Sequence, residues 1–364
     1  MVTIFYTNRW QQAKKLNLGF KPIKHRSKIV KVHKALVTPD FDNKTVLVRD
    51  HWDYVEMWLQ KEKKKEALMY WRQAESFYKA STAVPKTASP LTLYYCFLNA
   101  TKALLTVKGI AFVENHGARG KIQDGDTNLK NEEIKFHANG ILSSLCGYFS
   151  EPCNNDIYSL KDLLYNLPYI HRCFNLTFPT GYPEIYIPIN NPHFVIKDNS
   201  HKGWFYAELS GNYASKHSLN KIKSSGFEQD IGVKDRFVIR KKKRFDWYKS
   251  GEQKNHNIAK LTNYHKGLRK DLHYIHGPMT LWYVKRRDGN KCIARHPLTI
   301  MLACMHRLSE LARYEPAVVF RHFELKQNWL LSEFIKGSGL EFVDKIACEI
   351  TNQNLMIPAV RTIK

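Results

Sequence analysis

The sequence predicts a mainly α-helical protein with a β-rich insertion, and two observations support this. Apolar residues recur at spacings of three and four over long stretches in both halves of the chain, which is typical of amphipathic helices. Between these stretches, short runs rich in Ile, Val, Phe, Trp and Tyr alternate with Asn, Gly, Pro or Ser, which is typical of strands. We therefore expect a basic N-terminal arm (1–50), an N-terminal helical region (51–177), a β-rich insertion that ends in a basic cluster (178–250), and a C-terminal helical region that packs on the first (251–364).

The N-terminal helical region contains two predicted long helices. The first has an amphipathic pattern from Tyr54 to Ala80. The second covers Leu91–Lys108, because Pro90 suits the first helical position and Gly109 suits the end. Its residues are apolar nearly all round, so we expect a central, buried helix. The polar, glycine-containing segment 114–135 is expected to be an exposed loop.

The later elements follow from the same two patterns. A helix is expected over Ser159–Arg172, broken or kinked at Pro168. Strands are expected at 185–189, 193–197, 203–209 and 236–240. A strong helix begins at Pro297 and is limited by Pro316. Two further helices are expected, over 329–336 and 340–350, separated by glycines.

Positive charge is concentrated in two stretches of the chain. The protein has 364 residues and a formal net charge of +24, from 57 Lys and Arg against 33 Asp and Glu. Residues 1–36 hold nine Lys and Arg and no acid, and residues 234–270 hold 13 against three, so the two stretches carry 19 of the 24 excess charges. Such a field predicts contact with a polyanion, and nucleic acid of either kind, DNA or RNA, is the expected partner.

These two stretches supply the candidate nucleic-acid-binding residues. The cations expected to contact phosphates are Lys24, Arg26, Lys28, Lys31, Arg240, Lys241, Lys242, Lys243 and Arg244. Trp247 and Tyr248 follow the second stretch and are candidates for stacking on unpaired bases. The alternative is a solvated basic loop, or a strand edge protected against aggregation, with both aromatic rings in the core. The arm is expected either as a short strand or as a flexible segment that orders on binding.

Several classes of protein are disfavoured. The longest apolar run, Leu298–Met305, is far too short to span a membrane, and Met1–Trp10 does not resemble a signal peptide. The seven cysteines form no CxxC pair, and we find no phosphate loop, dinucleotide fingerprint, nucleophile elbow or HExxH zinc helix. We therefore expect a cytoplasmic protein with reduced thiols, no membrane partner, no metal and no cofactor.

Two segments carry a resemblance to a known family. Residues 90–105 have the form PLxxYYxxLNxxKALL, followed by His116 and Gly117, and residues 308–316 contain LARYEP. These motifs, in this order, resemble the bacterial YaaC-like family, over roughly residues 54–358. The first helical hairpin is similar to HEPN domains, which are often ribonucleases of toxin and phage-defence systems. The resemblance therefore implies a HEPN-like helical body and a role in RNA cleavage or defence.

Four residues are catalytic candidates, on two grounds. The first ground is the Arg-x4–6-His motif that HEPN ribonucleases use. Arg269 and His276 meet the spacing, with an arginine to hold the scissile phosphate and a histidine for acid–base chemistry. His116 and Arg313 are candidates because they lie in the family-like motifs. The alternatives are structural: His116 caps a turn, and Arg313 pairs with a buried carboxylate.

Three functions from different classes remain open at this point. The first is a nucleic-acid-binding component of a bacterial antiviral defence system, without catalysis of its own. The second is a HEPN-like, metal-independent ribonuclease. The third is a structural subunit of a multi-protein complex, in which the basic patches meet an acidic partner protein.

Overall fold

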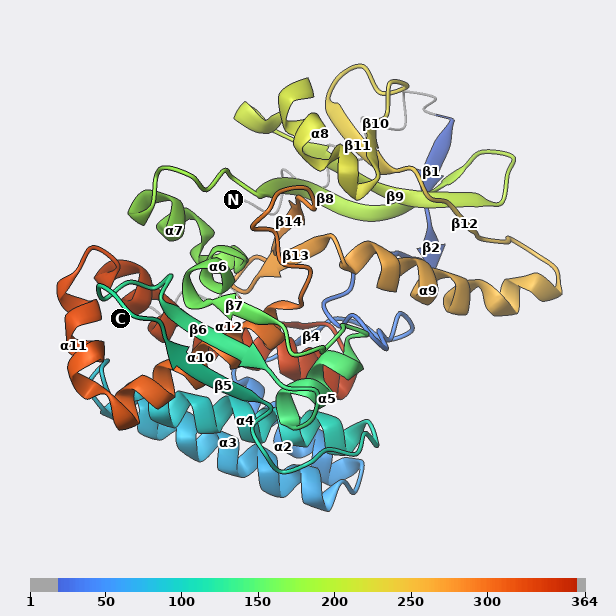
Figure 1. The fold of residues 1–364 in the computed structure, drawn as a ribbon. Helices are drawn as coiled ribbons and strands as arrows, with labels where there is room; N and C mark the ends of the chain where they lie inside the picture. The colour runs from blue at the N-terminus through green and yellow to red at the C-terminus, as the bar shows by residue number, and fades with distance from the viewer. Residues whose placement is uncertain (1–18, 359–364) are drawn as a thin grey trace, which may run out of the picture. The chain divides into compact units, whose positions relative to one another are not determined.

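In the computed structural model, the residues described are 19–358, and they form two compact units (Figure 1). Unit 1 consists of the chain up to Val32 together with Ile187–Leu268. Unit 2 consists of His33–Tyr186 together with the chain from Arg269 onward. Each unit is therefore built from two segments that lie far apart in the sequence.

Unit 2 is organised around the central helix α4 (Ser89–Val107), which is buried along most of its length, as predicted. It packs against α3 (Lys65–Ala83), α10 (Pro297–Tyr314) and α12 (Asn328–Thr351). The rings of Phe97 on α4 and Phe342 on α12 stack with centroids 4.0 Å apart. The remaining helices of the unit are α2 (His51–Lys61), α5 (Ile141–Tyr148), α6 (Leu160–Tyr165), α7 (His171–Thr177), α11 (Pro316–Glu324) and the 3-10 turn η1 (Pro168–Ile170).

Unit 2 also contains strands that pair locally. A three-stranded antiparallel sheet has the order β5 (Ala118–Ile122), β6 (Glu132–Phe136), β7 (Ile157–Ser159). A hairpin joins β13 (Leu272–Ile275) to β14 (Leu281–Lys285), and β4 (Val46–Leu47) pairs in parallel with β15 (Leu355–Met356).

Unit 1 is an antiparallel sheet with helix α9 (Asn257–Arg269) against one face. Its central strands have the order β10 (Phe227–Gln229), β11 (Phe237–Lys241), β9 (Lys202–Leu209), β8 (Tyr186–Lys197). Two short strands extend it, β1 (Phe20–Pro22) beside β8 and β12 (Phe245–Asp246) beside β9. Tyr264 of α9 fixes the helix on the sheet, because its hydroxyl accepts a hydrogen bond from Phe205 N at 3.0 Å. The smaller elements are β2 (Lys24–His25), β3 (Lys28–Ile29), α8 (Lys216–Ile222), η2 (Gly211–Tyr213), η3 (Lys223–Ser225) and η4 (Glu252–His256).

The prediction of a mainly α-helical protein with a HEPN-like helical body is wrong. The chain is a mixture, 46% helical and 19% strand. Strands also form outside the predicted insertion, and segment 114–135, expected to be a loop, contributes β5 and the start of β6. In β6, Glu132, Ile134 and Phe136 are all buried, so a buried glutamate disguised the alternation typical of a strand.

The C-terminal helices also differ in part from the prediction. Pro297 begins α10 as predicted. The two helices expected over 329–336 and 340–350 are a single helix, α12, because Gly337 and Gly339 continue it instead of ending it. Over residues 19–358, no helix combines the length and apolar character needed to cross a membrane.

Candidate functional site

The part of the basic arm from residue 19 to residue 32 is folded into unit 1, whereas residues 1–18 lie outside the described residues. Lys24 and Lys28 lie on the two strands of the β2–β3 hairpin, and all four predicted cations of the arm are exposed. The two turn residues, Arg26 and Ser27, have φ values of 46° and 66°, the combination typical of a tight type I′ turn. Lys31 forms an isolated bridge with His193 on β8, so the arm joins the edge of the sheet.

Some side chains of the cluster Arg240–Arg244 are engaged by other residues of unit 1, and others are exposed. Arg240 is engaged with Glu228, its Nε 2.8 Å from Oε1, and with Asp230. Lys241 Nζ donates to the Ser225 carbonyl, and Arg244 lies over the Trp204 ring at 4.6 Å. Lys242 and Lys243 are exposed. Three of the five side chains therefore support the fold of unit 1, and two point their charge to solvent.

The two candidate stacking residues, Trp247 and Tyr248, differ in how far their rings are buried. Trp247 is only 8% exposed, and its backbone N–H donates to the His201 carbonyl at 2.7 Å. Tyr248 is half-buried, with its ring parallel to His201 at 5.0 Å and the ammonium of Lys260 4.5 Å above it. A base could stack on Trp247 only if the ring left its present position.

The arm and the cluster belong to one surface region. The His25 ring of the arm packs edge-on against the Trp247 ring, with centroids 6.2 Å apart. One row of paired residues crosses the sheet from the arm to the segment after the cluster: Lys21, Ile196, Gly203 and Phe245. Residues about 225 positions apart in the chain are therefore neighbours in unit 1.

The charge of the protein is divided unequally between the units. Unit 1 holds 24 Lys and Arg against 7 Asp and Glu, and so carries 17 of the 24 excess positive charges. Unit 2 is more than twice as large and carries the remaining seven. The electrostatic attraction to a polyanion is therefore concentrated in unit 1.

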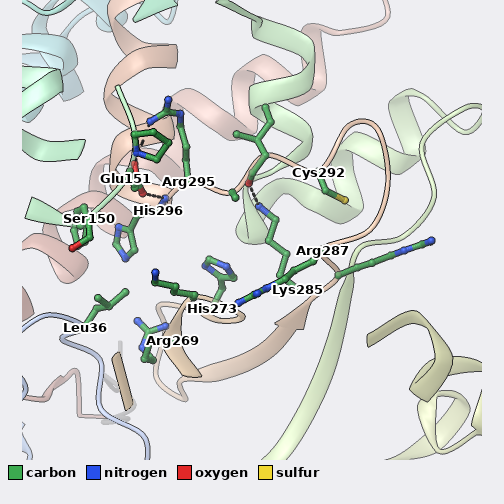
Figure 2. A pocket seen from close by; sticks show the side chains of 16 residues that line it. Leu36, Ser150, Glu151, Arg269, His273, Lys285, Arg287, Cys292, Arg295 and His296 are labelled. Atoms are coloured by element: carbon green, nitrogen blue, oxygen red, sulfur yellow. Dashed lines mark hydrogen bonds and ion pairs between the residues drawn. The ribbon is translucent and has the colours of Figure 1, made fainter. Parts of the chain in front are cut away.

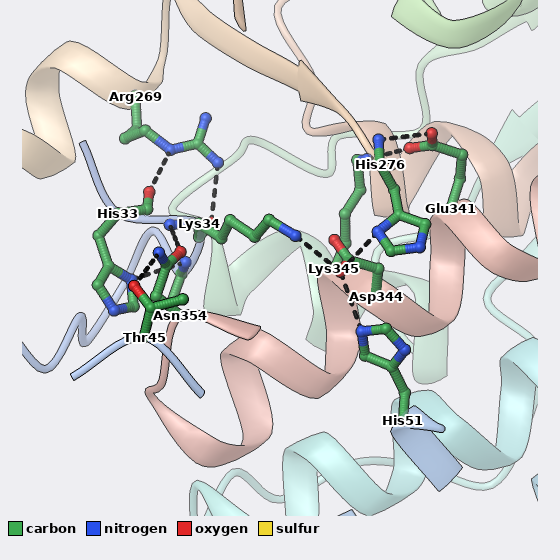
Figure 3. Close-up of polar contacts among 11 residues, drawn as sticks. His33, Lys34, Thr45, His51, Arg269, His276, Glu341, Asp344, Lys345 and Asn354 are labelled. Atoms are coloured by element: carbon green, nitrogen blue, oxygen red, sulfur yellow. Dashed lines mark hydrogen bonds and ion pairs between the residues drawn. The ribbon is translucent and has the colours of Figure 1, made fainter. Parts of the chain in front are cut away.

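The candidate pair Arg269 and His276 have separate sets of partners in unit 2 (Figure 3). Arg269 is buried, and each of its three guanidinium nitrogens donates to a backbone carbonyl, of His33, Lys34 and Leu272. An arginine whose nitrogens are used in this way ties the backbone together and has little left for a phosphate.

His276 belongs to a buried cluster around Asp344. The Asp344 Oδ1 atom lies 2.8 Å from His276 Nδ1, 3.1 Å from His51 Nε2 and 2.9 Å from the Lys34 ammonium. Burial alone would raise the pKa of Asp344, but these partners hold it well below its usual value. The two imidazoles and the carboxylate have the positions of a three-ligand metal site. Because Lys34 already supplies a cation to the same oxygen, a metal ion would compete with it.

His116 and Arg313, taken from the two family-like motifs, lie near a shared group of aromatic and imidazole rings. His116 is exposed, and its Nδ1 is 2.6 Å from the Tyr94 hydroxyl. The His306 ring lies 5.0 Å from the Tyr94 ring and 5.4 Å from the His116 ring. Arg313 donates to the Tyr95 hydroxyl at 2.9 Å. Although His116 as a whole is exposed, partial burial of its ring and the charge of Arg313 both lower its pKa, so the imidazole is neutral near pH 7.

Sequence reasoning missed two members of this group, His306 and Glu310. His306 Nδ1 lies 3.7 Å from the Glu310 carboxylate, and burial lowers the pKa of His306 to about 3. Their spacing of four residues on α10, directly before and within the second motif, is the signal that could have identified them.

The fold and these sites define a two-unit α+β protein, with a strongly basic sheet unit and a helix-rich unit that brings two sequence motifs together. The chain belongs to the YaaC-like family, because the family model described as YaaC-like Protein matches residues 36–350. The four candidate cations of the arm, Lys24, Arg26, Lys28 and Lys31, precede the matched region, whereas the cluster Arg240–Arg244 lies within it. Comparisons with curated proteins and with solved structures gave no match.

Proposed function

We propose that this protein binds nucleic acid through the basic surface of unit 1. The observation that carries the proposal is the contact between His25 and Trp247, because it joins the arm and the basic cluster into one region. The exposed cations of this region include Lys21, Lys24, Arg26, Lys28, Lys31, Lys242 and Lys243. Cations grouped in this way neutralise phosphates and release condensed counterions, which drives binding.

The surroundings of the aromatic residues favour contact with the phosphate backbone over reading of bases. Trp247 is buried, and the arginines with the geometry for paired contacts to guanine, Arg240 and Arg244, are engaged inside unit 1. We therefore expect binding that depends weakly on sequence and steeply on salt.

Charge reversal at two exposed lysines tests this proposal. In the double variant Lys242→Glu and Lys243→Glu, affinity for a labelled RNA or DNA oligomer should fall about tenfold or more at low salt. The slope of log affinity against log salt should become shallower by about two, because two phosphate contacts are lost. Fluorescence anisotropy across a salt series measures both quantities.

The matched control reverses the same number of charges in unit 2, at Lys64 and Lys65, which are exposed at the start of α3. This control should bind almost as well as the wild type. Equal losses in both double variants would show that only net charge matters, and a wild type that does not bind at low salt would overturn the proposal.

We propose metal-independent cleavage of RNA as a second candidate function, favoured by the group of rings around His116. With the proton on Nδ1 and donated to the Tyr94 hydroxyl oxygen, Nε2 of this exposed imidazole carries the lone pair that a general base needs, and exposed Arg313 supplies positive charge nearby. The roles in a defence system and in a complex with an acidic protein remain predictions.

Substitution of His116 tests the second candidate. The variant His116→Ala should lower the rate of RNA cleavage by about a hundredfold or more in the presence of a chelator. His217→Ala, at an exposed histidine of unit 1, is the control and should keep full activity. Gel analysis of single-stranded and folded RNA measures the rate, and a wild type that cleaves neither would exclude this function.

A further inference from the structure

Unit 2 contains a partly open cavity of about 410 Å³ that neither proposed function uses (Figure 2). Its lining consists of Leu36, residues 149–152 after α5, the two strands of the β13–β14 hairpin with their flanks, and the segment 292–296 that leads into α10. Its volume lies in the range of small-molecule binding sites, which is about 300–1,000 Å³.

The wall of the cavity is strongly basic. Its lining includes six Lys and Arg residues but only one carboxylate, that of Glu151. Three of these cations form ion pairs with aspartates: Arg286 with Asp288, Arg287 with Asp271, and Arg295 with Asp156. Lys270 is exposed at the rim and forms no ion pair with any residue in 19–358. The side chain of Lys285 is buried, and its ammonium donates to the Ile293 carbonyl at 2.7 Å.

A buried imidazole on the wall has an unused polar atom. His273 is 4% exposed, and its Nε2 has no hydrogen-bond partner among the described residues. Burial, and then the charge of Lys285, hold its pKa well below the usual value, so the ring is neutral. A buried polar atom without a partner is costly, on the order of 1–3 kcal/mol, and a bound ligand would satisfy it.

A second imidazole supplies a donor whose proton position the structure fixes. His296 Nδ1 accepts a hydrogen bond from Leu298 N at the start of α10, so the proton of the neutral ring is on Nε2. Beside it, Glu151 accepts a hydrogen bond from His296 N, and its Oε2 is 3.6 Å from Arg295 Nη1. Burial raises the pKa of Glu151 to about 7, so this carboxyl is protonated more readily than an exposed one, which weakens its repulsion of an anion.

We propose that this cavity binds a small molecule through a phosphate monoester group. A phosphate offers several acceptor oxygens to a wall that presents ammonium and imidazole donors, with Lys270 and His273 as its expected partners. Leu36, Phe149 and Pro152 supply an apolar part of the lining for the remainder of the ligand. Inorganic phosphate alone would fill only part of the volume. The inference does not depend on nucleic-acid binding by unit 1.

Calorimetry with adenosine monophosphate, adenosine and inorganic phosphate tests the site. We expect the monophosphate to bind at least about tenfold more tightly than adenosine, and the variant Lys270→Glu to lose at least about tenfold of that affinity. Lys336→Glu, which changes the same charge at an exposed position of α12, should bind like the wild type. Because Lys270 is exposed, its substitution should leave the fold intact.

The source of the phosphate is distinguished with a short oligonucleotide that carries either a 5′-phosphate or a 5′-hydroxyl. This arm uses the variant with Lys242→Glu and Lys243→Glu, so that binding to unit 1 does not obscure the result. A preference for the 5′-phosphate that Lys270→Glu abolishes would assign the site to a nucleic-acid end, and binding of the monophosphate alone would assign it to a free metabolite. No preference for any phosphorylated probe, or equal affinity of Lys270→Glu and wild type, would overturn the proposal.

Discussion

At the scale of single residues, unit 2 is distinguished by charges that are buried and paired. Glu132 on β6 accepts hydrogen bonds from Arg307 on α10, at 2.7 and 3.0 Å, and lies 3.0 Å from His322 Nε2 on α11. Lys34 and Asp344 form a similar buried pair. Removal of one partner would leave an uncompensated charge in the interior, at a cost of about 3–5 kcal/mol. These pairs join elements that are distant in sequence, so we infer that they fix the packing of the unit.

Buried histidines predict a loss of stability in acid. Burial is the largest cause that lowers the pKa of His33, His171 and His193 to about 4, and of His306 to about 3. Because the unfolded chain binds a proton near pH 6.5 and the folded chain does not, each histidine should cost about 1 kcal/mol between about pH 7 and about pH 5.5. Urea denaturation at several pH values measures this slope.

Replacement of one buried histidine tests whether these histidines cause the pH dependence of stability. His193→Phe retains a ring beside Tyr206 and should make the pH dependence shallower, whereas replacement of the exposed His217 should not. Glu151 acts in the opposite direction, because its raised pKa favours the folded state as pH falls. It therefore reduces the total loss of stability on acidification. A protein that becomes more stable on acidification from neutral pH would contradict the prediction.

At the scale of elements, α12 shows why glycines did not divide the C-terminal helix. A Cβ atom on Gly339 would lie 2.6 Å from Tyr78 Cε2 of α3, and one on Gly337 would lie 3.1 Å from the Tyr169 ring. The glycines thus permit close packing of neighbouring elements on α12, and their helical conformation is maintained by that packing. Helix propensity, which favours a break at glycine, is the weaker effect here.

This packing predicts opposite effects for two glycine-to-alanine substitutions. Gly339→Ala should destabilise the protein by about 1–3 kcal/mol, because overpacking outweighs the helix propensity gain of about 1 kcal/mol. Gly147→Ala in α5 meets no atom within 4 Å and should be neutral or stabilising by up to about 1 kcal/mol. Chemical denaturation of both variants measures the difference, and equal stability would show that Tyr78 moves aside without cost.

At the scale of the whole molecule, the two units differ in charge as well as in fold. A unit with 17 excess positive charges repels itself, and a bound polyanion relieves this repulsion. The salt dependence predicted for Lys242 and Lys243 belongs to this scale, because it reports the field of unit 1 and not one contact. The family match extends through this unit apart from the arm, so the arm is the part of the basic surface that the family model does not account for.

Elements with a local signal can be predicted from the amino-acid sequence. The sequence predicts helix α4 from its nearly continuous apolar surface between Pro90 and Gly109, and helix α10 from the one-sided apolar pattern that begins at Pro297. The break at Pro168 is predicted from its missing N–H. The sheet β5–β6 was not predicted, because its burial depends on partners elsewhere in unit 2, such as the Arg307 guanidinium that makes a buried Glu132 stable. The positive charge and the two family motifs were also evident from the sequence.

Only the tertiary structure decided which of these residues remain available for function. Arg240 and Arg244 are engaged by Glu228 and Trp204, whereas Lys242 and Lys243 between them are exposed, a difference that composition cannot show. The lining of the cavity comes from segments more than a hundred residues apart. The physical reason is that periodicity reports contacts within one element, whereas ion pairs, ring contacts and cavities arise where distant segments meet.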